Sequence, residues 1–157
     1  MRDDYMSDIS PGEILNTARD FIETASSPHS AMEGIVGLLK ASFPYYDWVG
    51  IYLLDDNNLL RLGPFRGEPS PHIAIPIGEG ICGAAAASKE TIIVEDVNAD
   101  PRYLACSLKT KSEIVVPIKK GERVFGEIDI DSDIRAAFGL NDQKLLEEIA
   151  RGLAEIM

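Results

Sequence analysis

The sequence predicts an α+β domain of the sandwich type, in which a central, mostly antiparallel sheet of about five to six strands is flanked by N- and C-terminal helices. Three observations predict this class. Amphipathic helical patterns occupy both ends of the chain, strand-like segments fill the middle, and hairpin turns join two pairs of those strands. A length of 157 residues suits one domain, which we expect to span residues 1–157.

Two helices are predicted at the N-terminal end. Ser10 suits the N-cap position, Pro11 the first helical position, and Glu13 completes a capping box, so this helix should run to about residue 25. A second helix begins in the same way at the Ser-Pro pair of residues 27–28. Its apolar residues recur at helical spacing: Met32, Ile35, Val36, Leu38 and Leu39.

The next segment predicts a hairpin. Residues 48–54 are rich in aromatic and aliphatic side chains, residues 59–65 form the returning strand, and the acidic and amide residues 55–58 make the turn. Isoleucines at alternate positions from Ile73 to Ile77 then predict a third strand, because side chains of a strand alternate between its two faces.

The second half predicts one helix, three strands and a closing helix. A glycine turn at residues 78–80 leads into small residues, 81–87, that suit a closely packed helix. The strands are expected at residues 91–95, 113–118 and 123–131, and the last helix near residue 141. Residues 96–111 form the longest irregular stretch, and loops of that length are often functional.

The charge of the chain excludes some partners. Its 15 basic and 26 acidic residues give a formal net charge of −11, whereas nucleic acids and anionic membranes need a basic surface. No apolar run reaches the ~18 residues of a membrane-spanning helix, and the polar N-terminus does not resemble a signal peptide. We therefore expect a cytoplasmic protein, whose two cysteines are too few for a secreted disulfide scaffold.

Neither a metal site nor a nucleotide site is predicted. Cys82 and Cys106 are far apart in the sequence, and the two histidines complete no metal-ligand motif. Gly78, Gly80 and Gly83 match G-x-G-x-x-G, but no βαβ unit surrounds them and the intervening glutamate would repel a pyrophosphate. We interpret this motif as a turn that brings the backbone close to another group, with the second cysteine as one candidate.

The two cysteines remain as candidates for chemistry. Each taken alone could equally be a buried thiol that acts as a small apolar residue. Cys82, however, follows the glycine turn and precedes a helix, whose N-terminus would lower the pKa of the thiol. Cys106 lies in the long loop, near Lys109 and Lys111, which would stabilise a thiolate.

Segments with a consistent order and spacing carry a family resemblance. They are Asp47–Leu54, Leu62–Gly67, Ile75–Gly83, Val94–Val97, Ala105–Cys106, Ser112–Pro117 and Gly126–Ser132. This series resembles the free methionine-(R)-sulfoxide reductases over roughly residues 12–157. The resemblance implies a GAF-like sandwich, in agreement with the α+β prediction.

The resemblance also implies an enzyme, a thioredoxin-dependent L-methionine (R)-S-oxide reductase that needs no cofactor. A cysteine thiolate attacks the sulfoxide sulfur of free L-methionine (R)-S-oxide, methionine leaves, and the cysteine becomes a sulfenic acid. By its motif Cys106 resembles the nucleophile and Cys82 the resolving thiol, so a Cys82–Cys106 disulfide is expected. Thioredoxin or a similar dithiol would restore both thiols.

Substrate-binding residues are implied in the same way. Glu113, Asp129 and Asp131 resemble an acidic cluster in which one member holds the substrate ammonium and another, kept protonated, is the general acid. Trp48 and Tyr52 resemble the wall around the methylsulfinyl group. The residues alone leave alternatives open, since the two aspartates lie two apart on a strand and also suit a solvated face, and both aromatic residues suit a core.

The chain departs from the family pattern at one cysteine, and two functions other than an enzyme stay open. Many family members carry a third cysteine where this chain has His72, so resolution falls to Cys82, to a second subunit or to an external thiol. A standalone GAF-type ligand or redox sensor would bind a ligand without turnover, and a structural domain would leave both thiols unreactive. The end of the chain near its last helix favours the enzyme, and a homodimer is expected from the resemblance.

Overall fold

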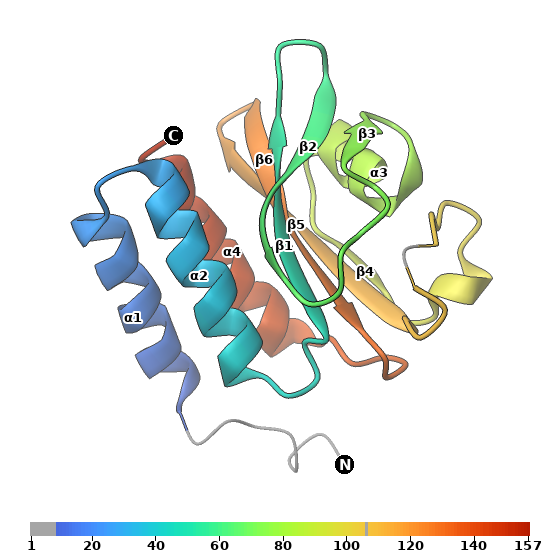
Figure 1. Cartoon of the computed structure of the whole chain (residues 1–157), viewed down its shortest axis with the longest axis horizontal. Coiled ribbons are helices and arrows are strands. Elements are labelled where there is room, and N and C mark those ends of the chain that lie inside the picture. Colours follow the sequence, from blue (N-terminus) through green and yellow to red (C-terminus); the bar gives the residue numbers. More distant parts are fainter. Residues whose placement is uncertain (1–8, 106) are drawn as a thin grey trace.

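The computed structural model describes residues 9–105 and 107–157 and has the predicted α+β architecture (Figure 1). Within these residues six strands form one sheet in the order β3-β2-β1-β6-β5-β4, and neighbouring strands are antiparallel. The strands are β1 (Trp48–Leu54), β2 (Leu59–Arg66), β3 (Ala74–Pro76), β4 (Ile92–Val94), β5 (Ser112–Lys120) and β6 (Arg123–Ser132). The helices are α1 (Pro11–Thr24), α2 (Pro28–Ser42), α3 (Gly80–Ser88) and α4 (Leu140–Ala154), with a short 3-10 helix at Val97–Ala99.

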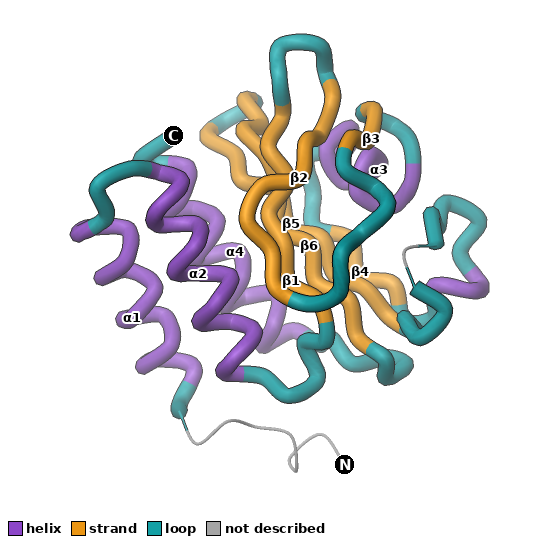
Figure 2. The backbone as a smooth tube through the Cα atoms, in the orientation of Figure 1, coloured by secondary structure: helices purple, strands orange, loops and turns teal. Residues whose placement is uncertain are grey.

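The two faces of the sheet have different coverings (Figure 2). Three helices, α1, α2 and α4, lie together on one face, and α3 lies on the other. The first face buries the larger apolar core, to which the sheet contributes Val49, Ile51, Ile114, Val116, Ile118, Ile128 and Ile130. The α3 face buries a second cluster, which includes Trp48, Tyr52, Ile81, Cys82 and Val115. Neighbouring residues of one strand therefore belong to different clusters, as the period of two requires.

The helices begin where their capping residues predict. Ser10 Oγ accepts a hydrogen bond from Glu13 N (3.2 Å), and Glu13 Oε2 accepts one from Ser10 N (3.3 Å), which completes the predicted capping box of α1. Ser27 caps α2 by accepting from Ser30 N (3.1 Å). None of the helices in the described part of the chain is long and apolar enough to cross a membrane.

The third strand is shorter than the isoleucine alternation predicts. A strand was expected from Ile73 to Ile77, but the regular part of β3 is Ala74–Pro76. Pro76 has no N–H with which to continue the ladder, and Gly78 turns the chain with a φ of 91°. Local chain chemistry, which the alternation alone does not capture, therefore ends this strand.

The glycine turn does bring the chain close to other groups. A Cβ at Gly83 would lie 2.6 Å from Pro76 O, so only glycine allows α3 to pack this tightly on β3. A Cβ at Gly80, where φ is 66°, would lie 2.7 Å from Leu104 Cδ1. The second cysteine, Cys106, lies outside the described residues, but the loop that leads to it packs directly on this turn.

Candidate functional site

Three acidic side chains follow one another along the α3 face of β6. Glu127, Asp129 and Asp131 alternate with Ile128 and Ile130, and both isoleucines point into the core on the helical face. The exposed fractions of the three acidic residues are 0%, 3% and 4%, respectively. Asp129 and Asp131 thus share one face, as the sequence predicts, and their burial excludes the alternative of a solvated face.

The register of the sheet brings a fourth carboxyl to this group. Glu113, which is also buried, pairs with Asp131 across β5 and β6, and Trp48 pairs with Asp131 from the β1 side. Asp129 lies between Gly50 and Val115. The three acidic residues that the resemblance singles out are therefore neighbours, although they come from two strands.

Trp48 lies along the sheet because its neighbour on the same face has no side chain. A Cβ at Gly50 would overlap the Trp48 ring, so this position requires glycine. The Trp48 ring stacks on Phe65 of β2, with 5.8 Å between the ring centroids. The indole is thereby held flat beside Asp129 and Asp131.

Trp48 and Tyr52 together hold the loop between β2 and β3, residues 67–73, which we name the cover segment. Trp48 Nε1 donates a hydrogen bond to Glu68 O (2.9 Å), and Tyr52 OH donates one to His72 O (2.8 Å). Both aromatic side chains are buried, and both also border the cavity under the cover segment. Core packing and a wall for a ligand are therefore compatible roles.

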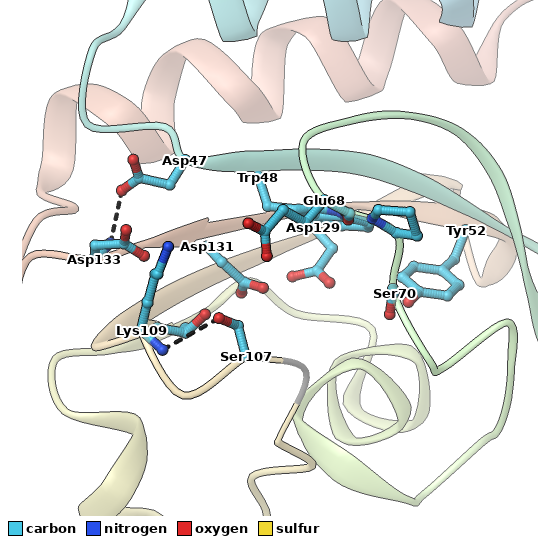
Figure 3. Close-up of a pocket in the computed structure, with 12 residues that line it drawn as sticks. Asp47, Trp48, Tyr52, Glu68, Ser70, Ser107, Lys109, Asp129, Asp131 and Asp133 are labelled. Atoms are coloured by element: carbon cyan, nitrogen blue, oxygen red, sulfur yellow. Dashed lines mark hydrogen bonds between the residues drawn. The ribbon is translucent and has the colours of Figure 1, made fainter.

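The cavity between the cover segment, β1, β6 and the loop before β5 has a volume of about 150 Å³ (Figure 3). This volume suits a small metabolite, since drug-sized ligands occupy pockets of about 300–1,000 Å³. Its walls are Asp47, Trp48, Tyr52, Glu68, Pro69, Ser70, Ser107, Lys109, Thr110, Asp129, Asp131 and Asp133. Five of these residues are acidic and one is basic. The cavity therefore favours a ligand with a cationic group.

Burial keeps protons on the acidic cluster. For both Glu113 and Asp131, burial raises the pKa of the carboxyl well above its usual range, and the negative charge of Asp129 raises it further. Burial also raises the pKa of Asp129, but interactions with Glu113 and Cys82 act in the opposite direction. Asp129 is therefore the member that ionises most readily, and Glu113 and Asp131 remain protonated to higher pH.

Cys82 occupies the third position of α3 and faces the carboxyls. Burial raises the pKa of this thiol well above its usual value, and Asp129, Glu127 and Glu113 raise it further. The expectation of a lowered pKa at the helix start was therefore wrong. The reason is direction, because the side chain points away from solvent into an acidic environment that outweighs the helix dipole.

A second, small cavity lies beside Cys82. Its volume is about 20 Å³, enough for one water molecule, and it shares Tyr52 and Asp129 with the larger cavity. Cys82, Glu113 and Leu104 are among its other walls. Tyr52 and Asp129 therefore lie between the larger cavity and the small one beside the Cys82 thiol.

The neighbours of Cys106 lie at the two cavities, although Cys106 itself is outside the described residues. Leu104 borders the small cavity together with Cys82, and Ser107 borders the large one. Ala105 O lies 3.1 Å from His72 Nε2, so His72 contacts the loop that leads to Cys106. Among the lysines named as thiolate partners, Lys109 lines the large cavity.

Glu127 is a buried acidic residue beside this site that the sequence did not single out. Its position could have been inferred, since it precedes Asp129 by two residues on the same strand and so faces the same side. The pattern of alternating charges was instead compatible with a solvent-facing strand. Asp47, Glu68 and Asp133 were missed for a different reason, since they lie in loops whose path the sequence does not specify.

The described residues contain one group with metal-binding geometry. Potential ligand atoms of Cys82, Glu113 and Asp129 lie within 4.8 Å of one another. A closed structural zinc site uses four ligands, usually sulfur and nitrogen, so this group is one ligand short and rich in oxygen. Burial also raises the pKa of all three groups, which favours their protonated forms over the anions that bind a metal ion.

Comparison with known proteins identifies the relatives of the chain. Residues 27–156 match the GAF domain family. A solved structure described as type II free methionine-R-sulfoxide reductase from Thermoplasma acidophilum is 39% identical, with a TM-score of 0.79 over 88% of this chain and 94% of that one. The chain belongs to the free methionine-R-sulfoxide reductase family of GAF-domain proteins.

Two other reductases extend this assignment. The structure of free methionine-R-sulfoxide reductase from Neisseria meningitidis in complex with its substrate is 33% identical, with a TM-score of 0.89 over 96% of this chain and 93% of that one. The free methionine-R-sulfoxide reductase of Saccharomyces cerevisiae is 44% identical over 108 residues, which cover 67% of this chain and 59% of that protein. The GAF-like fold and the family predicted from the sequence are thus confirmed.

Proposed function

We propose that this protein reduces free L-methionine (R)-S-oxide to L-methionine through Cys106, Cys82 and the acidic cluster. The observation that carries the proposal is the small acidic cavity, whose wall joins Trp48, Tyr52, Asp129 and Asp131 and which lies beside Cys82. The named reductases among its relatives support the reaction. Metal, flavin and nicotinamide are not required by this chemistry.

The first half of the reaction oxidises Cys106. Its thiolate attacks the sulfoxide sulfur, and a protonated carboxyl donates a proton to the oxygen as the S–O bond of the substrate breaks. The hydroxide released in this way adds to the Cys106 sulfur as the S–S bond between Cys106 and the substrate breaks, so methionine leaves and Cys106 becomes a sulfenic acid. The substrate sulfur gains two electrons and the Cys106 sulfur loses two. Glu113 is suited to be the acid, because burial and the neighbouring aspartates raise its pKa.

The second half restores the thiols. Cys82 attacks the sulfenic sulfur of Cys106, which yields a Cys82–Cys106 disulfide and water. Thioredoxin or a similar dithiol then reduces this disulfide by exchange. The walls of the small cavity support a direct reaction between the two cysteines, because Leu104, two residues from Cys106, lies there with Cys82.

Recognition of a free amino acid would use charge at both ends of the cavity. Asp129, the most readily ionised member of the cluster, would hold the substrate ammonium. Lys109 is the basic residue among those that line the large cavity, and it would attract the substrate carboxylate. A methionine sulfoxide within a peptide has neither charge, so it should not be a substrate.

A single-turnover experiment tests this proposal. Reduced protein is mixed with one equivalent of free methionine (R)-sulfoxide without a reductant, quenched with an alkylating reagent, and analysed by mass spectrometry. We expect one methionine released per chain and a Cys82–Cys106 disulfide. The matched control is peptide-bound sulfoxide, which should release nothing.

Two variants assign the roles of the cysteines in the same assay. Cys106→Ser should release no methionine, whereas Cys82→Ser should release one equivalent and leave a sulfenic acid that dimedone traps. Full turnover of Cys106→Ser would contradict the proposed nucleophile. Absence of methionine release by the parent protein, together with tight binding of the sulfoxide, would instead favour a sensor.

A further inference from the structure

His72 is a residue of this site that no step of the proposed reaction uses. It lines the small cavity together with Cys82 and Leu104, and it is not among the walls of the larger cavity. Its Nε2 lies 3.1 Å from Ala105 O, the carbonyl of the residue before Cys106. A carbonyl oxygen has no proton to give, so Nε2 must carry the hydrogen and donate it. The contact is therefore a hydrogen bond from the cover segment to the loop of residues 100–111, which we name the Cys106 loop.

The backbone of His72 is held by the sheet. Tyr52 OH, from β1, donates a hydrogen bond to His72 O (2.8 Å). His72 N donates to Ser70 Oγ (3.1 Å) within the cover segment. At the next residue, Leu62 N of β2 donates to Ile73 O (2.9 Å). The imidazole thus extends towards the Cys106 loop from a backbone that two strands fix in place.

The Cys106 loop is also held from a second side. Leu104 packs on the first residue of α3, where a Cβ at Gly80 would lie 2.7 Å from Leu104 Cδ1. Consecutive residues of the loop, Leu104 and Ala105, therefore contact different elements, α3 and the cover segment. Other hydrogen bonds of the loop connect near neighbours, as when Arg102 N donates to Asp100 Oδ1 (2.9 Å). The His72 contact differs because it joins the loop to a separate part of the fold.

We propose that His72 is a positioning residue for the nucleophile: its hydrogen bond to Ala105 O fixes the loop directly before Cys106 and so limits the positions from which Cys106 attacks. This inference rests on the proposed function, in which Cys106 is the nucleophile. The carbonyl of Ala105 belongs to the peptide group that joins Ala105 to Cys106, and a peptide group is planar. A hydrogen bond to this oxygen therefore restrains the chain at the point where Cys106 begins.

The geometry favours positioning over acid–base catalysis by His72. Nε2 directs its hydrogen at a carbonyl oxygen, whereas a catalytic acid or base exchanges its proton with a reacting group. The neutral Nε2–H tautomer and the imidazolium can both donate this hydrogen bond. Since His72 does not line the larger cavity, its loss should slow the attack on the sulfoxide and leave substrate binding unchanged.

Two amide substitutions separate the hydrogen-bond donor from the other properties of an imidazole. In His72→Gln, the amide nitrogen is as many bonds from Cα as Nε2 of histidine, so it can reach Ala105 O but cannot act as an acid or base. In His72→Asn, the amide nitrogen is one bond closer to Cα and falls short of that oxygen. His72→Leu removes the donor. His29→Leu is the control, because it removes the other histidine of the chain, which is exposed on α2.

The parent and the four variants enter the single-turnover assay at several concentrations of free methionine (R)-sulfoxide. We expect His72→Leu and His72→Asn to release methionine about tenfold more slowly than the parent, because the rate depends steeply on the placement of a reacting group. His72→Gln should stay within about twofold of the parent, and His29→Leu should match it. The half-saturating concentration of the sulfoxide should change by less than about twofold in every variant.

Two outcomes of this assay would overturn the inference. One is methionine release at the parent rate in both His72→Leu and His72→Asn. The other is His72→Gln that is as slow as His72→Leu, because the imidazole would then act by something other than hydrogen-bond donation. A parent protein that releases no methionine would overturn the proposed function instead, so the two failures are distinguishable.

Amide hydrogen exchange tests the positioning without relying on catalysis. Exchange is followed in a peptide that covers residues 100–111 of the folded proteins. We expect exchange about fivefold faster in His72→Leu and His72→Asn, the change that the about 1 kcal/mol of one hydrogen bond produces, and parent-like exchange in His72→Gln. Exchange in α1 should be the same in all proteins. Unchanged exchange of the Cys106 loop in His72→Leu and His72→Asn would overturn the inference even if methionine release were slower.

Discussion

Buried acidic residues occur on both faces of the sheet, but their oxygens have very different surroundings. On the helical face, Asp142 Oδ1 accepts hydrogen bonds from Tyr45 OH and Tyr46 OH (both 2.6 Å), and Oδ2 accepts one from Gly139 N (2.9 Å) at the start of α4. On the α3 face, buried oxygens of Glu127, Asp129 and Asp131 have no such partner among the described residues.

This difference separates a stabilising carboxyl from ligand-binding ones. The three hydrogen bonds to Asp142 fix the position of its side chain. The two from Tyr45 and Tyr46 also join α4 to the segment before β1. Burial, and then the charge of Asp142, hold the pKa of Tyr46 well above its usual value, so this donor keeps its proton at neutral pH. Buried oxygens without a partner reduce stability, and they remain available for a ligand or a proton.

The largest effect is expected when a carboxyl of the α3 face loses its charge. Asp129→Asn should lower kcat/KM for free methionine (R)-sulfoxide by about 10³-fold, or about 4 kcal/mol, because it removes the carboxylate proposed to bind the ammonium. The thermal midpoint should stay the same or rise, since a neutral amide is easier to bury than a charge. Steady-state kinetics and thermal unfolding together check both halves. A large loss of stability would place Asp129 in the same class as Asp142.

The converse variant tests the other face. Asp142→Ala should lower the free energy of unfolding by about 3 kcal/mol, because it leaves two tyrosine hydroxyls and one backbone N–H without an acceptor. The kcat/KM of the folded protein should change by less than about twofold, since Asp142 lies across the sheet from the cavity. Urea unfolding and kinetics at a temperature well below the midpoint provide the measurements. A selective loss of activity would contradict the proposed division between the two faces.

A smaller effect is expected at the positive end of the cavity. Lys109→Met keeps much of the side-chain volume but removes the charge proposed to attract the substrate carboxylate. KM should rise about tenfold, equivalent to about 1.4 kcal/mol, while kcat changes little. Lys111→Met is the matched control two residues away, because Lys111 does not line the cavity. Equal effects of the two variants would indicate general electrostatics rather than a specific contact.

The smallest predicted effect concerns pH. Glu113, Glu127 and Asp131 have folded-state pKa values raised by burial, so their unfolded forms lose protons first as the pH increases. Stability is therefore full below their unfolded values, near pH 4, and is lost as the pH rises towards the folded values. The thermal midpoint should be at least about 2 °C higher at pH 5.5 than at pH 8, equivalent to about 1 kcal/mol.

The same measurement has an internal control. Glu127→Gln removes one of these groups, so its midpoint should depend less on pH than that of the parent. A midpoint that rises between pH 5.5 and pH 8 in the parent would show that the unpartnered carboxyls do not dominate the pH dependence of stability.

Features that depend on neighbouring residues in the chain could be predicted from the sequence. The capping box of Ser10 and Glu13 is present, and Asp129 and Asp131 share one face because the period of a strand is two. The patterns of helices and strands predicted the α+β class, and the ordered series of motifs predicted the family, whose GAF-like fold agrees with that class. The domain bounds and the roles of the site residues stay predictions.

Features that depend on contacts between distant segments could not be predicted. The raised pKa of Cys82 follows from its burial, and further from carboxyls that are more than 30 positions away in the sequence and close to it in space. The burial of Glu127 depends on α3 covering this part of β6, which the strand pattern cannot show. The walls that the cover segment contributes depend on how its loop crosses the sheet.

The anchoring of the cover segment has a consequence for how this pocket could diversify during evolution. Trp48 and Tyr52 donate to the backbone carbonyls of Glu68 and His72, and not to their side chains. Substitutions at either position therefore leave the two anchors in place, provided that the backbone keeps its path. Residues of this loop can be exchanged to alter the lining of the cavity without releasing its cover, so ligand preference can drift while the architecture is conserved.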